Sequence, residues 1–241
     1  VRSRRQRQMC IRDRHNCVIQ AINANSIYEV PINFYNEELD KRVLEYFNLN
    51  TNKTIDLKMW SQVSKHVLEP EGKVVIGIVG KYTGLADAYK SLNEALSHGG
   101  IFNNVKVELK WFESEELNSS NTSSLLANCH GILVPGGFGE RGSEGKIAAI
   151  KYARENKIPY FGICFGMQLA VIEMARNILG MQDANSSEFS NCNNSIVGLM
   201  TEWITSDNTT EKRSKNDDLG GTMRLGSYEA KLKKGSKIHN I

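Results

Sequence analysis

The sequence FGICFGMQ, residues 161–168, places Cys164 between a short apolar stretch and an amphipathic one. We expect a strand followed by a helix, so that the thiol lies on a tight strand-to-helix turn at the edge of a sheet. The glycines two residues before and two residues after the cysteine remove Cβ atoms that would clash in such a turn. The helix would point its first N–H groups at the sulfur, which favours the thiolate. This pattern indicates covalent attack on a carbonyl, whereas the alternative is an inert core cysteine.

Apolar stretches alternate with helical patterns from residue 73 onward, which predicts an α/β fold with a mostly parallel sheet flanked by helices, as in flavodoxin-like proteins. The expected strands cover residues 74–80, 105–111, 131–135 and 158–163. Helices are expected at residues 86–98 and 143–156 and after Cys164, with a polar loop at 118–124. Ser143 is predicted to cap the second helix, and the pair Gly99-Gly100 is predicted to end the first. Ligands would then bind at the carboxyl ends of the strands.

The residues before position 73 show a different organisation. Residues 1–14 hold six arginines and one aspartate, and we interpret them as a leader that does not belong to a packed element. Residues 15–49, with a helix predicted at 37–47, are too short to form a core of their own and resemble the tail of another domain. Residues 50–72 are expected to be a linker that includes a short helix at 59–68.

Composition narrows the class of protein. The 241 residues carry a formal net charge of +3, with 40% hydrophobic and 24% charged residues, which is typical of a globular protein. Because the leader carries the positive excess, we expect no nucleic-acid partner. The apolar stretches are too short for a membrane span. The five cysteines show no C-x-x-C spacing, so we expect no metal site, reduced thiols and a cytoplasmic location.

The sequence PGGFG, residues 135–139, follows the third predicted strand. The N–H groups of Gly137 and Phe165 would together form an oxyanion hole beside Cys164. A phosphate-binding loop is the rival interpretation, although no Gly-Lys-Ser/Thr follows. A plain turn at the end of a strand also remains open.

A thiol nucleophile needs a base, usually a histidine oriented by a carboxylate. The sequence offers no convincing partner. His98 is expected near the end of a helix in a structural role, and His130 precedes the third strand at the wrong end of the sheet. The remaining histidines are His15, His66 and His239.

Several stretches resemble the glutaminase domain of the CTP synthase family, which consists of class I glutamine amidotransferases. The generic class I pattern is the Gly-x-Cys-x-Gly turn together with the glycine turn at 134–139. More specific are GKY at 80–82, DAYKSLNEAL at 87–96, NSSEF at 185–189 and DLGGTMRLG at 218–226. The stretch IYEVP at 27–31 resembles the end of the family's synthetase domain. The resemblance thus assigns residues 15–49 to the synthetase (amidoligase) tail and residues 73–241 to a glutaminase domain truncated at its C-terminus.

The resemblance implies roles for individual residues. Cys164 matches the nucleophile that forms a glutamyl thioester, and Glu188 matches the acidic residue that recognises L-glutamine. The glutamine-binding backbone and pocket correspond to Gly137, Phe165, Gly166, Met167 and Gln168. Residues 212–225 resemble a lid linked to GTP activation.

For the full enzyme the resemblance implies ATP-dependent amination of UTP to CTP with Mg²⁺, GTP activation and a homotetramer, with no cofactor in this chain. The family's base histidine, its carboxylate and an arginine that holds glutamine lie beyond the match to residues 218–226. We therefore expect the chain to be inactive alone. A non-catalytic glutamine-binding or regulatory module and a cysteine hydrolase of another substrate class remain the alternatives.

Overall fold

A computed structural model describes residues 17–50, 54–81, 84, 86–189, 194–198, 202–204, 210–212 and 229–241. The predicted leader therefore lies outside the described residues, as does almost all of the predicted lid. The chain forms two compact units, Val1–Val197 and Gly198–Ile241, which are described separately below.

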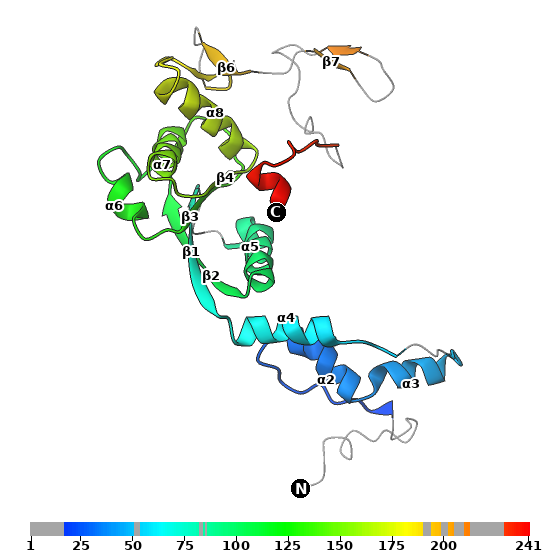
Figure 1. The fold of residues 1–241 in the computed structure, drawn as a ribbon. Helices are drawn as coiled ribbons and strands as arrows, with labels where there is room; N and C mark the ends of the chain where they lie inside the picture. The colour runs from blue at the N-terminus through cyan, green and yellow to red at the C-terminus, as the bar shows by residue number, and fades with distance from the viewer. Residues whose placement is uncertain are drawn as a thin grey trace. The chain divides into compact units, whose positions relative to one another are not determined.

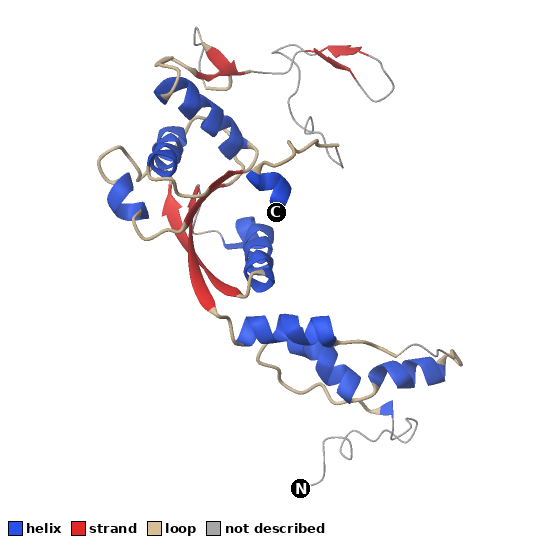
Figure 2. Cartoon of the chain, viewed as in Figure 1, coloured by secondary structure: helices blue, strands red, loops and turns tan. Residues whose placement is uncertain are grey.

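The first unit contains a four-stranded parallel sheet. The strands are β1 (Gly72–Gly80), β2 (Val105–Glu113), β3 (Gly131–Val134) and β4 (Tyr160–Gly162), in the spatial order β2-β1-β3-β4. Figure 2 shows how these strands alternate along the chain with helices. The predicted α/β class and all four predicted strands are confirmed.

The helices that connect or follow the strands lie on both sides of the sheet (Figure 1). They are α5 (Lys90–Phe102), α6 (Thr122–Leu126), α7 (Ser143–Glu155) and α8 (Phe165–Asn177). In Figure 1, α5 lies on one side of the sheet, and α6 and α7 lie on the other. Right-handed crossovers require this arrangement, because β2 is added on one side of β1, whereas β3 and then β4 are added on the other side. The switch in direction falls between β1 and β3, where ligands bind in open sheets.

The core of this unit lies between the sheet and helices α7 and α8. Its fully buried members include Val79 and Val134 from the sheet and Leu169 and Ile172 from α8. α7 contributes Ile147, Ile150 and Ala153, as their helical spacing predicts.

The residues that the structure describes before the sheet include the helical segments η2 (Ile27–Glu29), α2 (Val30–Asn36), α3 (Leu39–Tyr46) and α4 (Lys58–Leu68). A capping box between Ser26 and Glu29 begins the first of them, which satisfies backbone donors that a helix start leaves unpaired. α3 and α4 agree with the predicted helices at 37–47 and 59–68. The Trp60 indole donates a hydrogen bond to the Tyr28 carbonyl, and the Tyr28 hydroxyl lies 2.9 Å from His98 Nε2.

Four local predictions were wrong, and three of them concern α5 and α6. The Gly99-Gly100 pair does not end a helix, since α5 continues to Phe102. A side chain at Gly100 would meet the Val105 carbonyl at 2.7 Å, so this glycine lets the helix pack closely on β2. His98 accordingly lies inside α5, not at its end. The stretch expected as a polar loop at 118–124 contains the start of α6.

Ser143 is not the cap of α7. The N-cap is Gly142, in the left-handed conformation and without a side-chain hydrogen bond, and Ser143 is the first buried residue of the helix. The tight packing of the start of α7 against Ser114 leaves no room for a conventional cap side chain at position 142.

Short elements complete the described residues. η3 (Ala86–Tyr89) precedes α5, and β5 (Asn185–Ser186) pairs in parallel with β6 (Ser195–Val197). In the second unit, β7 (Glu202–Ile204) and β8 (Thr210–Lys212) form an antiparallel pair, and η4 (Lys237–Asn240) lies near the end of the chain.

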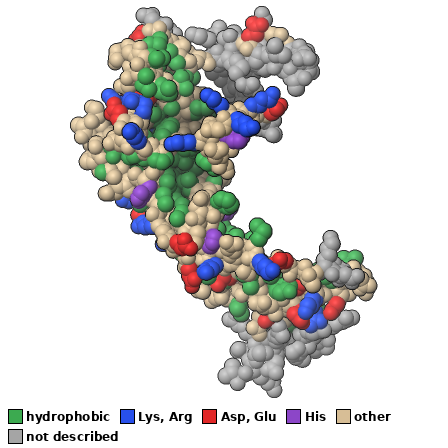
Figure 3. All heavy atoms as spheres, viewed as in Figure 1, with side chains coloured by type: hydrophobic (Ala, Val, Ile, Leu, Met, Phe, Trp, Pro, Cys, Tyr) green, Lys and Arg blue, Asp and Glu red, His purple; other side chains and the backbone are tan. Residues whose placement is uncertain are grey.

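Helix α8 carries apolar residues on two faces. Leu169 and Ile172 face the core, whereas Met167, Val171 and Met174 are exposed to solvent. Figure 3 shows hydrophobic side chains gathered on the face of the molecule that carries this helix. The apolar spacing of Met167, Val171 and Met174 along the helix thus marks a solvent-facing stripe.

Candidate functional site

Cys164 lies on a strained turn between β4 and α8. Its backbone angles are φ 52° and ψ −103°, and it is the N-cap of the helix. A positive φ at a non-glycine residue costs of order 1–3 kcal/mol and persists only where surrounding structure enforces it. The cysteine is exposed, so the alternative of a buried, inert core cysteine does not hold. The strand-to-helix turn predicted from the sequence is therefore present.

The two flanking glycines are required by close backbone approaches. A Cβ atom at Gly162 would lie 2.6 Å from the Gly166 carbonyl carbon and from the Met167 nitrogen. A Cβ atom at Gly166 would overlap the carbonyl oxygen of Val134. The first turn of α8 is thus pressed against both β4 and β3, which explains the Gly-x-Cys-x-Gly spacing in physical terms.

The glycine turn after β3 lies beside the cysteine. A Cβ built on Gly136 would be 3.6 Å from the Cβ of Cys164, and one built on Gly137 would be 3.9 Å from the Phe165 ring. These segments meet because β3 and β4 are neighbouring parallel strands, so their carboxyl ends share one edge of the sheet. As the first residue of α8, Phe165 has an N–H without an intrahelical acceptor.

Glu188 reaches the same turn from a distant segment. Its Oε1 accepts a 2.6 Å hydrogen bond from the Gly139 N–H, while its own N–H donates to Ser186 Oγ. The carbonyl of Phe138, on the other side of the same peptide unit, accepts a 2.9 Å hydrogen bond from Lys81 Nζ. The 138–139 peptide is therefore held from both sides, and the Glu188 carboxylate stands beside the turn.

Two buried lysines underlie this region, and sequence reasoning missed both. Lys81 follows β1, and burial, followed by the charge of Arg141, lowers its pKa. Lys146 in the first turn of α7 is 1% exposed, and burial lowers its pKa to about 8, with a further contribution from Lys81. The sequence contained one signal, because Lys146 precedes the inward-facing Ile150 by four residues and so shares its face of the helix.

The other predicted site residues form the first turn of α8. Gly166 is buried, and its carbonyl accepts a 2.8 Å hydrogen bond from the hydroxyl of the half-buried Tyr160, while burial raises the pKa of Tyr160. Met167 is exposed and Gln168 is half-buried. The structure thus brings Cys164 together with its predicted neighbours along α8.

The described histidines of the first unit all have other contacts. His66 Nδ1 lies 2.8 Å from the Ile101 carbonyl, and His98 contacts Tyr28. His130 Nδ1 accepts a hydrogen bond from the Val75 N–H at the amino end of the sheet, as its position before β3 predicts. Among the histidines that the structure describes in this unit, none faces Cys164.

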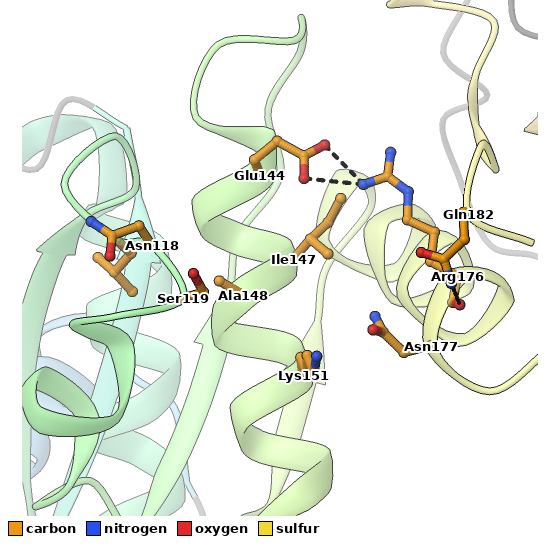
Figure 4. A pocket seen from close by; sticks show the side chains of 10 residues that line it. Asn118, Ser119, Glu144, Ile147, Ala148, Lys151, Arg176, Asn177 and Gln182 are labelled. Atoms are coloured by element: carbon orange, nitrogen blue, oxygen red, sulfur yellow. Dashed lines mark hydrogen bonds and ion pairs between the residues drawn. The ribbon is translucent and has the colours of Figure 1, made fainter. Parts of the chain in front are cut away.

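A separate cavity of about 340 Å³ lies between α7, α8 and the segment before α6. Figure 4 shows the ion pair that crosses one side of it, in which Arg176 Nη1 lies 2.9 Å from Glu144 Oε1. None of the predicted site residues lines this cavity.

Neither a metal cluster nor a membrane span is found in the described part of the chain. There, no three histidine, cysteine or acidic side chains gather in a way that could hold a metal ion. No described helix is long and apolar enough to cross a bilayer.

The fold and the cysteine turn agree with the comparisons with known proteins. The family model for glutamine amidotransferase class-I matches residues 84–240. The chain therefore belongs to the class I glutamine amidotransferase family, as its motifs predict.

Relatives of the chain include CTP synthases. The chain is 56% identical over 228 residues to the CTP synthase of Brucella anthropi and to that of Chelativorans sp.. The match covers 95% of this chain and 42% of each relative, so the chain spans less than half the length of these enzymes. A solved structure of the Trypanosoma brucei CTPS glutaminase domain with bound acivicin has 45% identity and a TM-score of 0.50, covering 53% of this chain and 50% of that one.

Proposed function

We propose that this chain supplies the glutaminase chemistry of a CTP synthase, with Cys164 as the nucleophile. The observation that carries the proposal is the exposed thiol on a strained turn at the start of a helix, beside the Gly136-Gly137 turn. Similarity to CTP synthases supports the choice of L-glutamine as the substrate.

In the proposed reaction the Cys164 thiolate attacks the side-chain amide carbon of glutamine. A C–S bond forms, and the π electrons of the carbonyl move to its oxygen, where the N–H groups of Gly137 and Phe165 donate hydrogen bonds. The oxyanion then collapses, the C–N bond breaks, and the nitrogen takes up a proton and leaves as ammonia. Water hydrolyses the remaining thioester to glutamate and returns the thiol.

Substrate recognition is assigned to residues around this turn. The Glu188 carboxylate would pair with the α-ammonium group of glutamine, a charge-assisted interaction. The pocket would be lined by Gly166, Met167 and Gln168 at the start of α8. The 2.6 Å hydrogen bond that Glu188 accepts from Gly139 supports this role, because it places the carboxylate at the rim of the glycine turn.

For the whole protein we propose transfer of the ammonia to UTP in an ATP- and Mg²⁺-dependent step, activation by GTP, a homotetramer and a cytoplasmic location. These proposals rest on similarity to CTP synthases. No residue that the structure describes in this chain is assigned to Mg²⁺, since no set of candidate ligands gathers there.

Labelling with an electrophile tests the nucleophile. A chloromethyl ketone analogue of L-glutamine is expected to form one adduct per chain at Cys164, as located by peptide mass spectrometry. Excess L-glutamine should slow the labelling and D-glutamine should not, and Glu188→Gln should weaken the protection by L-glutamine. Cys164→Ser and Cys129→Ser are matched controls, because Cys129 is buried. Equal labelling of other cysteines, or no protection by glutamine, would contradict the proposal.

Turnover is a separate question, because the structure describes no histidine of the first unit beside Cys164. We propose that this chain alone binds glutamine without releasing ammonia at the rate of a complete glutaminase, since loss of a catalytic base usually costs several powers of ten. Ammonia release measured with a coupled assay checks this. Turnover of several per second, of the order found for many enzymes, would show that a base is present in this chain after all.

A further inference from the structure

Lys146 is a buried cation next to both proposed oxyanion donors. Its Nζ lies 5.0 Å from the centroid of the Phe165 ring and 3.6 Å from the Cβ that a side chain at Gly137 would carry. The residue is 1% exposed. In the described part of the chain, its ammonium has no hydrogen-bond acceptor and no ion-pair partner within 4 Å, only the face of the aromatic ring.

Burying the charged side chain of a lysine in such a position is energetically unfavourable, which suggests that the charge serves a function. Lysines are almost never fully buried without a partner, because moving an ammonium out of water is costly. The charged groups that influence Lys146 are Lys81, at the end of β1, and Glu113, at the end of β2. Burial dominates and lowers the pKa to about 8, so the side chain still carries its proton at neutral pH. A methionine would fill the same space without this cost.

We propose that Lys146 is a positioning residue of the glutaminase site, whose ammonium beneath the Gly137 and Phe165 segments makes the potential at the carbonyl oxygen of a bound substrate more positive. The inference rests on the proposed function. The charge acts through space, and it acts strongly because the site is shielded from water on the side of α7. The Phe165 ring holds the ammonium in place by a cation–π contact.

Two electrophiles separate this role from a structural one. The carbonyl of a chloromethyl ketone analogue of glutamine uses the oxyanion donors, whereas iodoacetamide needs only the thiolate. Their rate-constant ratio at Cys164 therefore reports on the donors and cancels changes in the thiolate. At pH 7, Lys146→Met is expected to lower the ratio about tenfold, a modest effect for a charge this close in a shielded site.

The control is Lys151→Met, which removes an exposed lysine from the same helix and should leave the ratio within about twofold of wild type. Circular dichroism verifies that both variants are folded. A Lys146 that only maintained the geometry of the donors would give a wild-type ratio that does not depend on pH between 7 and about 9.5. A folded Lys146→Met chain with the wild-type ratio would overturn the inference.

The pH dependence of the wild-type chain gives a second readout that needs no variant. As pH rises through about 8, Lys146 loses its proton, and the ratio should fall toward the value of Lys146→Met, which itself should not change over this range. A wild-type ratio that stays constant from pH 7 to about 9.5, well past the titration, would overturn the inference. If wild-type Cys164 does not react with the chloromethyl ketone at all, both the proposed function and the inference are wrong. Normal wild-type labelling combined with an unaffected Lys146→Met chain refutes the inference alone.

Discussion

At the scale of the residue, Cys164 shows how an exposed side chain is held in an unfavourable backbone conformation. The close packing of the flanking glycines holds its φ at 52°. Gly166 packs on the Val134 carbonyl, and Gly162 packs on the backbone of the next turn. The Tyr160 hydroxyl also donates a hydrogen bond to the Gly166 carbonyl. The exposure of the sulfur therefore depends on how the residues around the turn pack against one another.

Gly166→Ala tests this dependence. The added methyl group would overlap the Val134 carbonyl oxygen, and such overpacking typically costs about 1–3 kcal/mol. We expect a lower urea midpoint and slower labelling of Cys164. The matched control is Gly99→Ala in α5, where a Cβ meets nothing within 4 Å, and it should stabilise the chain by about 0.5–1 kcal/mol. Equal effects of the two substitutions would contradict the packing argument.

At the scale of the element, α7 and α8 are joined by an ion pair between a buried carboxylate and an arginine that reaches the surface. Glu173 in α8 is fully buried, and its Oε1 accepts hydrogen bonds of 3.0 and 2.8 Å from Nε and Nη2 of Arg154 in α7. The side-chain hydrogen bond with Glu173 raises the pKa of Arg154. This bidentate contact holds α7, which contains Lys146, against α8, which begins after Cys164.

Removing one partner of this pair leaves a buried carboxylate without its cation. Arg154→Leu is therefore expected to destabilise the chain by about 1–3 kcal/mol, as measured by urea unfolding at pH 7. Glu155→Gln removes a neighbouring exposed partner of Arg154 and should cost less than about 1 kcal/mol. A small effect of Arg154→Leu would mean that water reaches Glu173 once the arginine is gone.

At the scale of the first unit, the buried Lys146 links folding to pH. Its pKa is lowered from the ordinary 10.5 to about 8 in the folded chain. Between these two values the unfolded chain binds a proton that the folded chain has lost, so stability rises with pH across this window. Below about pH 8 the lysine is charged in both states and the full cost of burying it, about 3 kcal/mol, is present.

Lys146→Met should remove this cost and its pH dependence. We expect the variant to be more stable than wild type at pH 7, with the difference shrinking toward pH 10. Urea midpoints at several pH values, compared with those of Lys151→Met, check this, and the comparison cancels groups that titrate in both chains. A variant less stable than wild type at pH 7 would show that the ammonium makes a favourable interaction in the fold.

The sequence predicted the local features well, because they depend on neighbours along the chain. Apolar runs identified β1 and β3, and the glycines around Cys164 predicted the strained turn. Predictions failed where a distant segment decided the outcome. Gly100 looked like a helix end, yet it allows α5 to pack on β2. Ser143 was predicted to cap α7, but the cap is Gly142, where a side chain would clash with Ser114.

The sequence alone therefore determined the α/β class and the strand-to-helix turn that carries Cys164, since periodicity and the Gly-x-Cys-x-Gly spacing are local properties. Only the tertiary structure decided that the Gly136-Gly137 turn stands beside Cys164, because that contact depends on β3 and β4 being neighbours in the sheet. Only the tertiary structure showed Lys81 and Lys146 buried beneath the turn. Burial is set by which elements pack over a side chain, and no short stretch of sequence specifies that.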